Sequence, residues 1–247
     1  MARQRHLANA PIREAVLELR TSPPQQDIEP TLREIIEGLE GYKEPTTLRV
    51  FEGNISFSGG DEPAAETVLH RVQGFRASSE DDLRVIQFKV DGVTFSRLAP
   101  YTTWEEVAAE AKILWQAYAD VIAPETVTRI AVRYINHIRL PHPIRDIDDY
   151  FTSLPRIPDT LPQVFTSFLS RVTIFEEERQ FSAHVSHALV DDIDPDRLGV
   201  ILDIDAFHEG VMDPTTGSLW ETFEGLRGFK NLIFFESITE RTAEMFE

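Results

Sequence analysis

The chain has 247 residues, 42% of them apolar and 27% charged, and 42 acidic against 24 basic residues give a formal net charge of −18. This is the composition of an ordinary globular protein, and its negative field repels phosphate backbones and anionic lipid headgroups. We therefore expect neither nucleic acid nor a membrane surface as a partner. Cysteine is absent, which excludes disulfides, thiolate metal sites and a cysteine nucleophile. With no signal-peptide run and no window apolar enough to span a bilayer, we expect a cytoplasmic protein.

The first quarter of the chain predicts strands around one short helix. Residues 12–20 alternate between polar and apolar side chains, which is typical of a half-buried strand. Residues 31–39 have apolar side chains at helical spacing, and glycines end the pattern. Residues 48–57 and 68–76 read as two more strands, although 64–69 also tolerates a helix.

A hairpin and a capped helix follow. Two alternating runs, 83–90 and 93–98, flank Asp91-Gly92, a pair that favours a type I′ turn, whose central residues both need positive φ. Thr102 and Thr103 each precede a glutamate by three residues and form two overlapping capping boxes ahead of an apolar stripe. We expect a helix over 104–121, closed by Pro124.

Residues 128–140 predict a long strand with two different faces. One face is apolar apart from Asn136, which is most simply a buried amide that satisfies backbone groups. The opposite face carries four basic side chains in an otherwise acidic protein: Arg129, Arg133, His137 and Arg139. This basic face is a candidate site for an anionic ligand or an acidic peptide. The simpler interpretation is internal pairing with carboxylates of neighbouring strands.

The second half of the chain predicts a similar set of elements. Residues 146–151 suggest a short helical piece, followed by a proline-rich loop to 162. Two alternating runs, 167–175 and 180–190, form a hairpin with a charged tip, and 198–207 adds a third strand. A further capping box at Ser218 begins a closing helix with a possible break at Gly228.

The element order repeats between residues 1–125 and 126–247. Each half reads as strand, helix, three or four strands, helix. We therefore predict an α+β fold of two tandem β-α-β(3-4)-α units, forming a mostly antiparallel sheet with helices packed on one face, in one compact pseudo-symmetric body. Chance recurrence of the same order in an α+β chain is the alternative.

Several short segments resemble a known family. Residues 9–16 (NAPIREAV), 95–98 (FSRL), 133–136 (RYIN) and 237–239 (SIT) are similar, in this order, to a sporadically distributed family of uncharacterised prokaryotic proteins of about this length. The resemblance implies no reaction, cofactor or catalytic residue. Patchy distribution is typical of genes carried by mobile elements, including defence and toxin-neutralising genes.

Acidic residues near the end of the last predicted strand form a second candidate site. Asp203 and Asp205 share one strand face and His208 follows just past the strand end, an arrangement that a divalent metal can use. No second histidine or carboxylate is tied to them by spacing, so we predict no metal and keep the three residues as candidate ligand or partner contacts. Residues 192–203 mimic an EF-hand loop, but Arg197 replaces the required glycine and favours a solvated turn.

Motifs for catalysis are missing from the sequence. It has no nucleophile elbow and no glycine-rich loop for a nucleotide phosphate, and so we predict no cofactor and no catalytic residue. The first functional hypothesis is a non-enzymatic accessory protein that binds another protein, as in a defence or toxin-neutralising system, because an acidic surface can mask a basic partner. The alternative is a protein or enzyme that binds a small anionic ligand on the open sheet face. A homo-oligomer is compatible with both.

Overall fold

The computed structural model describes residues 1–52, 55–56, 64–65, 69–144, 146–158, 160–163, 166–215 and 217–247. Its elements in chain order are β1 (Ile12–Thr21), α1 (Glu29–Glu37), β2 (Thr46–Glu52), β3 (Ile55–Ser56), β4 (Ala64–Ala65), β5 (Leu69–Ser78), β6 (Arg84–Lys89), β7 (Gly92–Leu98), α2 (Trp104–Ile122), β8 (Val127–Pro141), the 3-10 turn η1 (Ile147–Asp149), β9 (Leu169–Glu176), β10 (Phe181–Val190), β11 (Arg197–Met212), α3 (Ser218–Ser237) and α4 (Glu240–Glu244).

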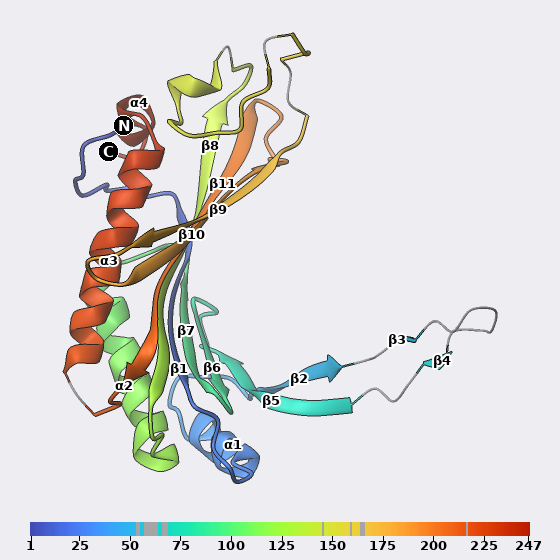
Figure 1. Ribbon diagram of the computed structural model, residues 1–247, viewed down its shortest axis with the longest axis vertical. Helices are drawn as coiled ribbons and strands as arrows, with labels where there is room; N and C mark the ends of the chain where they lie inside the picture. Colours follow the sequence, from blue (N-terminus) through green and yellow to red (C-terminus); the bar gives the residue numbers. More distant parts are fainter. Residues whose placement is uncertain are drawn as a thin grey trace.

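One nine-stranded sheet organises the molecule (Figure 1). Its strand order is β2-β5-β6-β7-β1-β8-β11-β10-β9, and every neighbouring pair is antiparallel. The central pair is β1 with β8, so the strands of the first half lie on one side of this pair and those of the second half on the other. The predicted α+β class with an antiparallel sheet is confirmed.

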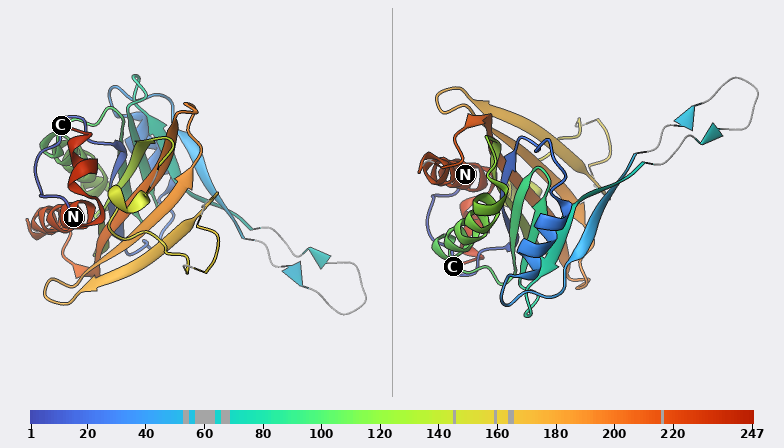
Figure 2. Two further views of the ribbon diagram at one scale, coloured as in Figure 1. Left: turned by 90° about the horizontal axis from the view of Figure 1, so that it is seen from above. Right: turned by 90° about the horizontal axis from the view of Figure 1, so that it is seen from below.

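The long helices cover one face of the sheet (Figures 1 and 2). Helix α1 contacts β5 and β6, α2 contacts β7 and β1, and α3 contacts β8 and β11. The core lies between these layers, and its largest fully buried side chains include Tyr118, Tyr134, Phe88, Phe95 and Phe223. The opposite face, here called the open face, carries the polar residues of each alternating strand.

Helix α2 forms where its caps predict it. The Thr103 side chain accepts a hydrogen bond from the Glu106 N–H at 3.2 Å, which satisfies one of the free donors of the first turn. The helix ends when Ala123 adopts a left-handed conformation with φ of 46°, one residue before Pro124. Its apolar stripe is buried, including Val107, Leu114 and Trp115.

The β6–β7 hairpin is confirmed, but its turn differs from the prediction. Lys89 pairs with Gly92, so the two loop residues are Val90 and Asp91, and neither has positive φ. The type I′ prediction was therefore wrong. Gly92 itself has a φ of +136°, and an added Cβ would lie 2.0 Å from the Leu19 carbonyl oxygen. The glycine is needed because β1 approaches the start of β7 closely.

The start and the middle of α3 also differ from the prediction. The N-cap is Gly217, without a side-chain cap hydrogen bond, and the helix continues through Gly228 for 20 residues. The sequence did not predict α4. Residues 64–65 are extended rather than helical, and the predicted strand 48–57 corresponds to β2, with its far end partly outside the described residues.

The two ends of the chain lie together (Figure 1). The Asn9 N–H donates to the Phe246 carbonyl at 2.9 Å, and Arg5 forms ion pairs with Glu240 and Glu247, both at 2.7 Å. The N-terminal segment is thereby fixed against the end of the C-terminal half. Within the described residues, no helix is both long and apolar enough to cross a membrane.

Candidate functional site: a cavity on the open face of the sheet

The predicted basic face of β8 lies on the open face. Residues alternate along β8, so the even-numbered Ile130 and Tyr134 are buried under the helices while Arg133 is exposed on the other side. In the adjacent strand β11, Asp205 is directly opposite Arg133 and Glu209 is opposite Arg129. Acidic side chains therefore face the basic ones across the strand pair.

Each arginine of this face is held by a carboxylate. Arg133 donates to both oxygens of Asp203, at 2.8 and 2.6 Å. Arg139 donates to both oxygens of Asp192, at 2.6 and 2.7 Å. Bidentate pairs of this kind fix the guanidinium plane. The internal pairing favoured by the sequence is therefore confirmed, and these two arginines are already occupied by the protein itself.

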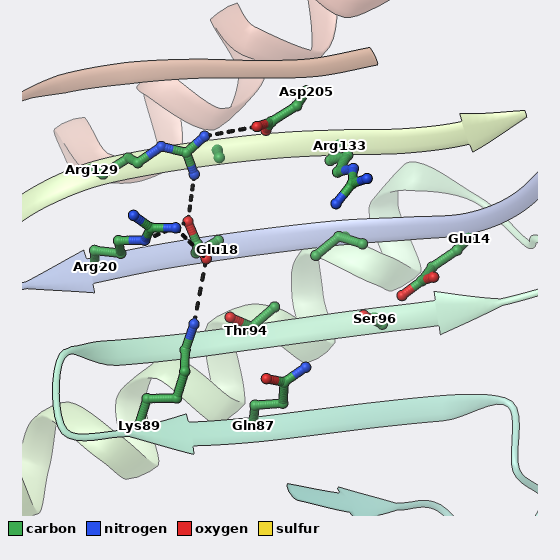
Figure 3. A pocket seen from close by; sticks show the side chains of 12 residues that line it. Glu14, Glu18, Arg20, Gln87, Lys89, Thr94, Ser96, Arg129, Arg133 and Asp205 are labelled. Carbon is green, nitrogen blue, oxygen red and sulfur yellow. Dashed lines mark hydrogen bonds and ion pairs between the residues drawn. The ribbon is translucent and has the colours of Figure 1, made fainter. Parts of the chain in front are cut away.

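The centre of the open face is a charge network around Glu18 of β1 (Figure 3). Arg129 donates to Glu18 and, at 2.9 Å, to Asp205. Arg20 lies 2.9 Å from a Glu18 oxygen, and Lys89 of β6 lies 3.5 Å from the other oxygen. Burial alone would raise the pKa of Glu18, but Lys89, Arg129 and Arg20 lower it below the ordinary value. Glu18 is thus a partly buried carboxylate, 13% exposed, that stays charged.

A cavity of about 270 Å³ lies beside this network. Four central strands of the sheet and one residue of β11 line it: Glu14, Val16, Glu18, Arg20, Gln87, Lys89, Thr94, Ser96, Arg129, Ala131, Arg133 and Asp205. One half of the lining consists of the paired charges around Glu18. The four remaining polar residues, which we call the unpaired half, are Glu14, Gln87, Thr94 and Ser96, and the last two lining residues, Val16 and Ala131, are apolar.

The unpaired half makes no side-chain hydrogen bond or ion pair with any described residue. Thr94 is only 7% exposed, and its hydroxyl is buried with no hydrogen-bond partner among the described residues. Ser96 is only 4% exposed. Figure 3 shows Gln87, Thr94, Ser96 and Glu14 on β6, β7 and β1, beside the charge network. Buried polar groups are nearly always hydrogen-bonded in native proteins. A bound molecule can supply the hydrogen-bond partners that this half of the cavity lacks.

The remaining predicted residues are placed separately. His137 is partly buried, and its Nδ1 lies 3.2 Å from Arg13. Asp203 and Asp205 lie on the open face, whereas His208 is opposite the buried Ile130 on the helix-covered face. The placement therefore does not support a shared ligand for His208 and the two aspartates. Within the described residues, no group of three or more histidine and carboxylate side chains is suited to hold a metal ion.

Asn136 has the structural role expected of it. It is 2% exposed, and its side-chain amide donates to the Leu202 carbonyl oxygen at 3.0 Å. The neighbouring backbone is irregular, because β1 has a register shift between Ile12 and Glu14 opposite this residue. The amide itself satisfies a backbone acceptor of β11, on the other side of β8 from this shift.

Sequence reasoning missed the unpaired half, although a signal was present. Gln87 and Lys89 alternate with apolar residues in β6, and Thr94 and Ser96 do the same in β7. This alternation places all four on one face of a sheet. What the sequence lacks is the strand order, which places β7 next to β1 and β6 on the far side of β7.

Comparison with protein-family models and with curated proteins gave no match. The resemblance drawn from short segments therefore stays an expectation, and the functional argument rests on the geometry of the open face.

Proposed function

We propose that the chain is a non-enzymatic binding protein that holds a small polar molecule in the open-face cavity. The observation that carries this proposal is the unpaired half of the cavity, above all the Thr94 hydroxyl, which is buried and has no partner in the part of the chain that the structure describes. A buried polar group left unsatisfied costs about 1–3 kcal/mol. A ligand that completes these hydrogen bonds offsets that cost.

The lining also indicates the class of ligand. Gln87, Thr94 and Ser96 offer both donors and acceptors, and Glu14 adds a carboxylate. The cations of the lining are engaged by Glu18, Asp203 and Asp205, so a strongly anionic ligand would have to displace these carboxylates. We therefore favour an uncharged or zwitterionic molecule rich in hydroxyl or amide groups over an anion.

The lining favours binding over catalysis. It contains two hydroxyl groups but no histidine, which is the usual base for activating a serine or threonine nucleophile. The charged groups are fixed to one another in the Glu18 network. This arrangement supplies a rigid, pre-formed polar surface.

Thermal-shift screening of the purified full-length chain tests the proposal. The panel contains polyols, free amino acids, nucleosides and dicarboxylates, and a ligand found in it is then titrated against Thr94→Val and Ser96→Ala. We expect an uncharged or zwitterionic compound to bind and Thr94→Val to weaken its binding at least tenfold. Thr173→Val is the matched control, because Thr173 lies on the open face of β9 away from the cavity. Unchanged binding by Thr94→Val, or a panel without any binder, would overturn the proposal.

A second candidate function is the binding of another protein, as in a neutralising component of a mobile-element defence system. A second cavity of about 340 Å³ between α2 and α3 favours it, because aromatic residues line this cavity, including Trp104, Trp220 and Phe223. Aromatic anchors in pockets dominate many protein interfaces. Native mass spectrometry of the chain purified from its own host separates the two candidates, because a stoichiometric protein partner lost in Trp220→Ala supports the second.

We further propose that the two halves are tandem units. The order within the sheet supports this, because β1 and β8 are the first strands of their halves and form the central pair, and β7 and β11, the last strands, flank them. Co-expressed fragments 1–125 and 126–247 are expected to assemble into one complex. Fragments that stay unfolded together would count against the proposal.

A further inference from the structure

Strand β9 forms an exposed edge of the sheet. It is the last strand in the order and pairs only with β10 among the described strands (Figure 2). Four large apolar side chains on it are exposed, namely Leu169 (77%), Val172 (55%), Ile174 (38%) and Phe175 (57%). Natural edge strands are usually blunted by proline, charge or a bulge. Between 169 and 175, β9 has no proline, a single charge and regular pairing with β10.

The free backbone groups of β9 follow from its pairing with β10. The Leu189 N–H donates to the Phe168 carbonyl oxygen at 3.1 Å, so these two residues form a hydrogen-bonded pair. Such pairs alternate with non-hydrogen-bonded pairs along an antiparallel ladder. The backbone N–H and C=O groups of the even-numbered residues of β9 therefore form hydrogen bonds with β10. The odd-numbered residues direct their N–H and C=O groups outward: Leu169, Arg171, Thr173 and Phe175.

We propose that β9 pairs antiparallel with β9 of a second copy of this chain, about a two-fold axis at Val172. This register pairs Leu169 with Phe175 of the second copy and Arg171 with Thr173 of the second copy. All four outward-facing residues of both strands then form hydrogen-bonded pairs. If the axis is moved to a neighbouring residue, at least one of the four outward-facing residues no longer lies opposite an outward-facing residue of the second copy.

The side chains fit the same register. The apolar Leu169 lies opposite the apolar Phe175 on the open face. On the other face, Val172 meets its own copy and Ile174 lies opposite Ser170. Arg171 lies opposite Thr173, so no like charges face one another directly.

The local charge of this edge permits a second copy to approach. Each chain carries a net charge of −18, and two copies therefore repel one another over most of their surfaces. Residues 169–175 contain one basic residue and no acidic one, so this edge lets two acidic molecules approach with little local repulsion. The self-complementary pattern about Val172 is what pairing with an identical strand requires. The inference is independent of any ligand in the open-face cavity.

The first test is the mass of the full-length chain. Analytical ultracentrifugation is expected to show a dimer of twice 28.2 kDa. Val172→Asp places two carboxylates face to face at the axis and should raise the dimer dissociation constant at least tenfold. Val211→Asp is the control, because Val211 is 84% exposed on β11, and it should leave the constant unchanged. A chain that stays monomeric at all concentrations, or an equal effect of both variants, would overturn the proposal.

The second test fixes the register, using the absence of native cysteine. In Val172→Cys the two thiols sit in a non-hydrogen-bonded pair with a Cα separation of about 4.5 Å, which a disulfide spans. Oxidation should therefore give a covalent dimer. In Ile174→Cys the two thiols are four residues out of register, roughly 13 Å apart, and should not link. Efficient linking of Ile174→Cys without that of Val172→Cys would refute the register.

Discussion

Arg133 donates to both oxygens of Asp203, although Asp205 is the residue directly opposite it in β11. Arg129 makes a longer diagonal contact, since it bonds at 2.9 Å to Asp205, four positions from Glu209, while Glu209, directly opposite, is 3.9 Å away. The diagonal pairing leaves each aspartate with one arginine. The two arginines differ in exposure. The side chain of Arg129 is 11% exposed, whereas that of Arg133 is 46% exposed.

This difference in exposure predicts different effects on stability. Arg129→Met removes the cation shared by Glu18 and Asp205 and leaves two carboxylates close together, so we expect a loss of roughly 3 kcal/mol in the free energy of unfolding. Arg133→Met breaks a more exposed pair and should cost less than about 1 kcal/mol. Urea-induced unfolding of both variants measures the difference. Equal losses would show that the Glu18 network is not the stabilising centre of the open face.

The faces of the strands could be predicted from the sequence, but the partners of their side chains could not. Alternation correctly assigned Arg129 and Arg133 to one side of β8, and the same rule separated Asp203 from His208 once the sheet was known. The contact between Arg129 and Glu18 joins residues 111 positions apart. It depends on β1 and β8 being neighbours, and no local pattern encodes that order.

The turn residues show the same limit at a smaller scale. Asp91-Gly92 correctly indicated a hairpin, but the backbone uses Gly92 for the close approach of Leu19 rather than for a type I′ turn. Likewise, Ser218 resembles a cap by sequence, yet Gly217 takes that position. In both cases a contact made by the folded chain decides the local geometry.

The burial of His187 leads us to expect a loss of stability in mild acid. It is 3% exposed under the helix layer, its Nε2 has no hydrogen-bond partner among the described residues, and burial lowers its pKa to about 4. Between the ordinary value of 6.5 and about 4, the unfolded chain binds a proton that the folded chain does not. Stability therefore falls as pH falls through this window. His187→Leu should remove up to about 3 kcal/mol of that pH dependence.

The free energy of unfolding of variant and wild type, measured at several pH values between 7 and 4, checks this expectation. The difference between the two proteins is compared, because Glu18 and Asp192 also titrate in acid and affect both. His6→Gln is the control, since His6 is exposed, and its profile should follow the wild type. A His187→Leu profile parallel to that of the wild type would contradict the assignment.

The burial of Lys230 leads us to expect that the stability of the folded chain depends on pH in the alkaline range. Its Nζ lies 3.7 Å from the centre of the Tyr134 ring, and it forms no ion pair with a described residue. Burial, with a smaller effect of Arg227, lowers its pKa from 10.5 to about 7. Between these values the unfolded chain binds the additional proton, so stability rises with pH in this window.

Lys230→Met should therefore be more stable than the wild type at pH 7, by at least about 1 kcal/mol, with the difference shrinking toward pH 10.5. Thermal unfolding at pH 7 and pH 9.5 measures this change. Lys112→Met is the matched control, because Lys112 also lies over an aromatic ring, 5.9 Å from the centre of Trp220, but is exposed. A larger pH-dependent gain in the control would contradict the explanation by burial.

Thr94 gives the most direct test of the cavity in the ligand-free protein. Valine has nearly the shape of threonine and lacks the hydroxyl, which in Thr94 is buried and finds no partner within the described ranges. Because an unsatisfied buried hydroxyl costs about 1–3 kcal/mol, Thr94→Val should raise the free energy of unfolding by roughly 1 kcal/mol. Ser79→Ala is the comparison, since the Ser79 hydroxyl is also buried but donates to Asp81 at 2.5 Å and accepts from the Arg84 N–H at 3.0 Å; its loss should destabilise. Destabilisation by Thr94→Val would mean that the hydroxyl is already satisfied, and the cavity would then lose its main reason to bind a ligand.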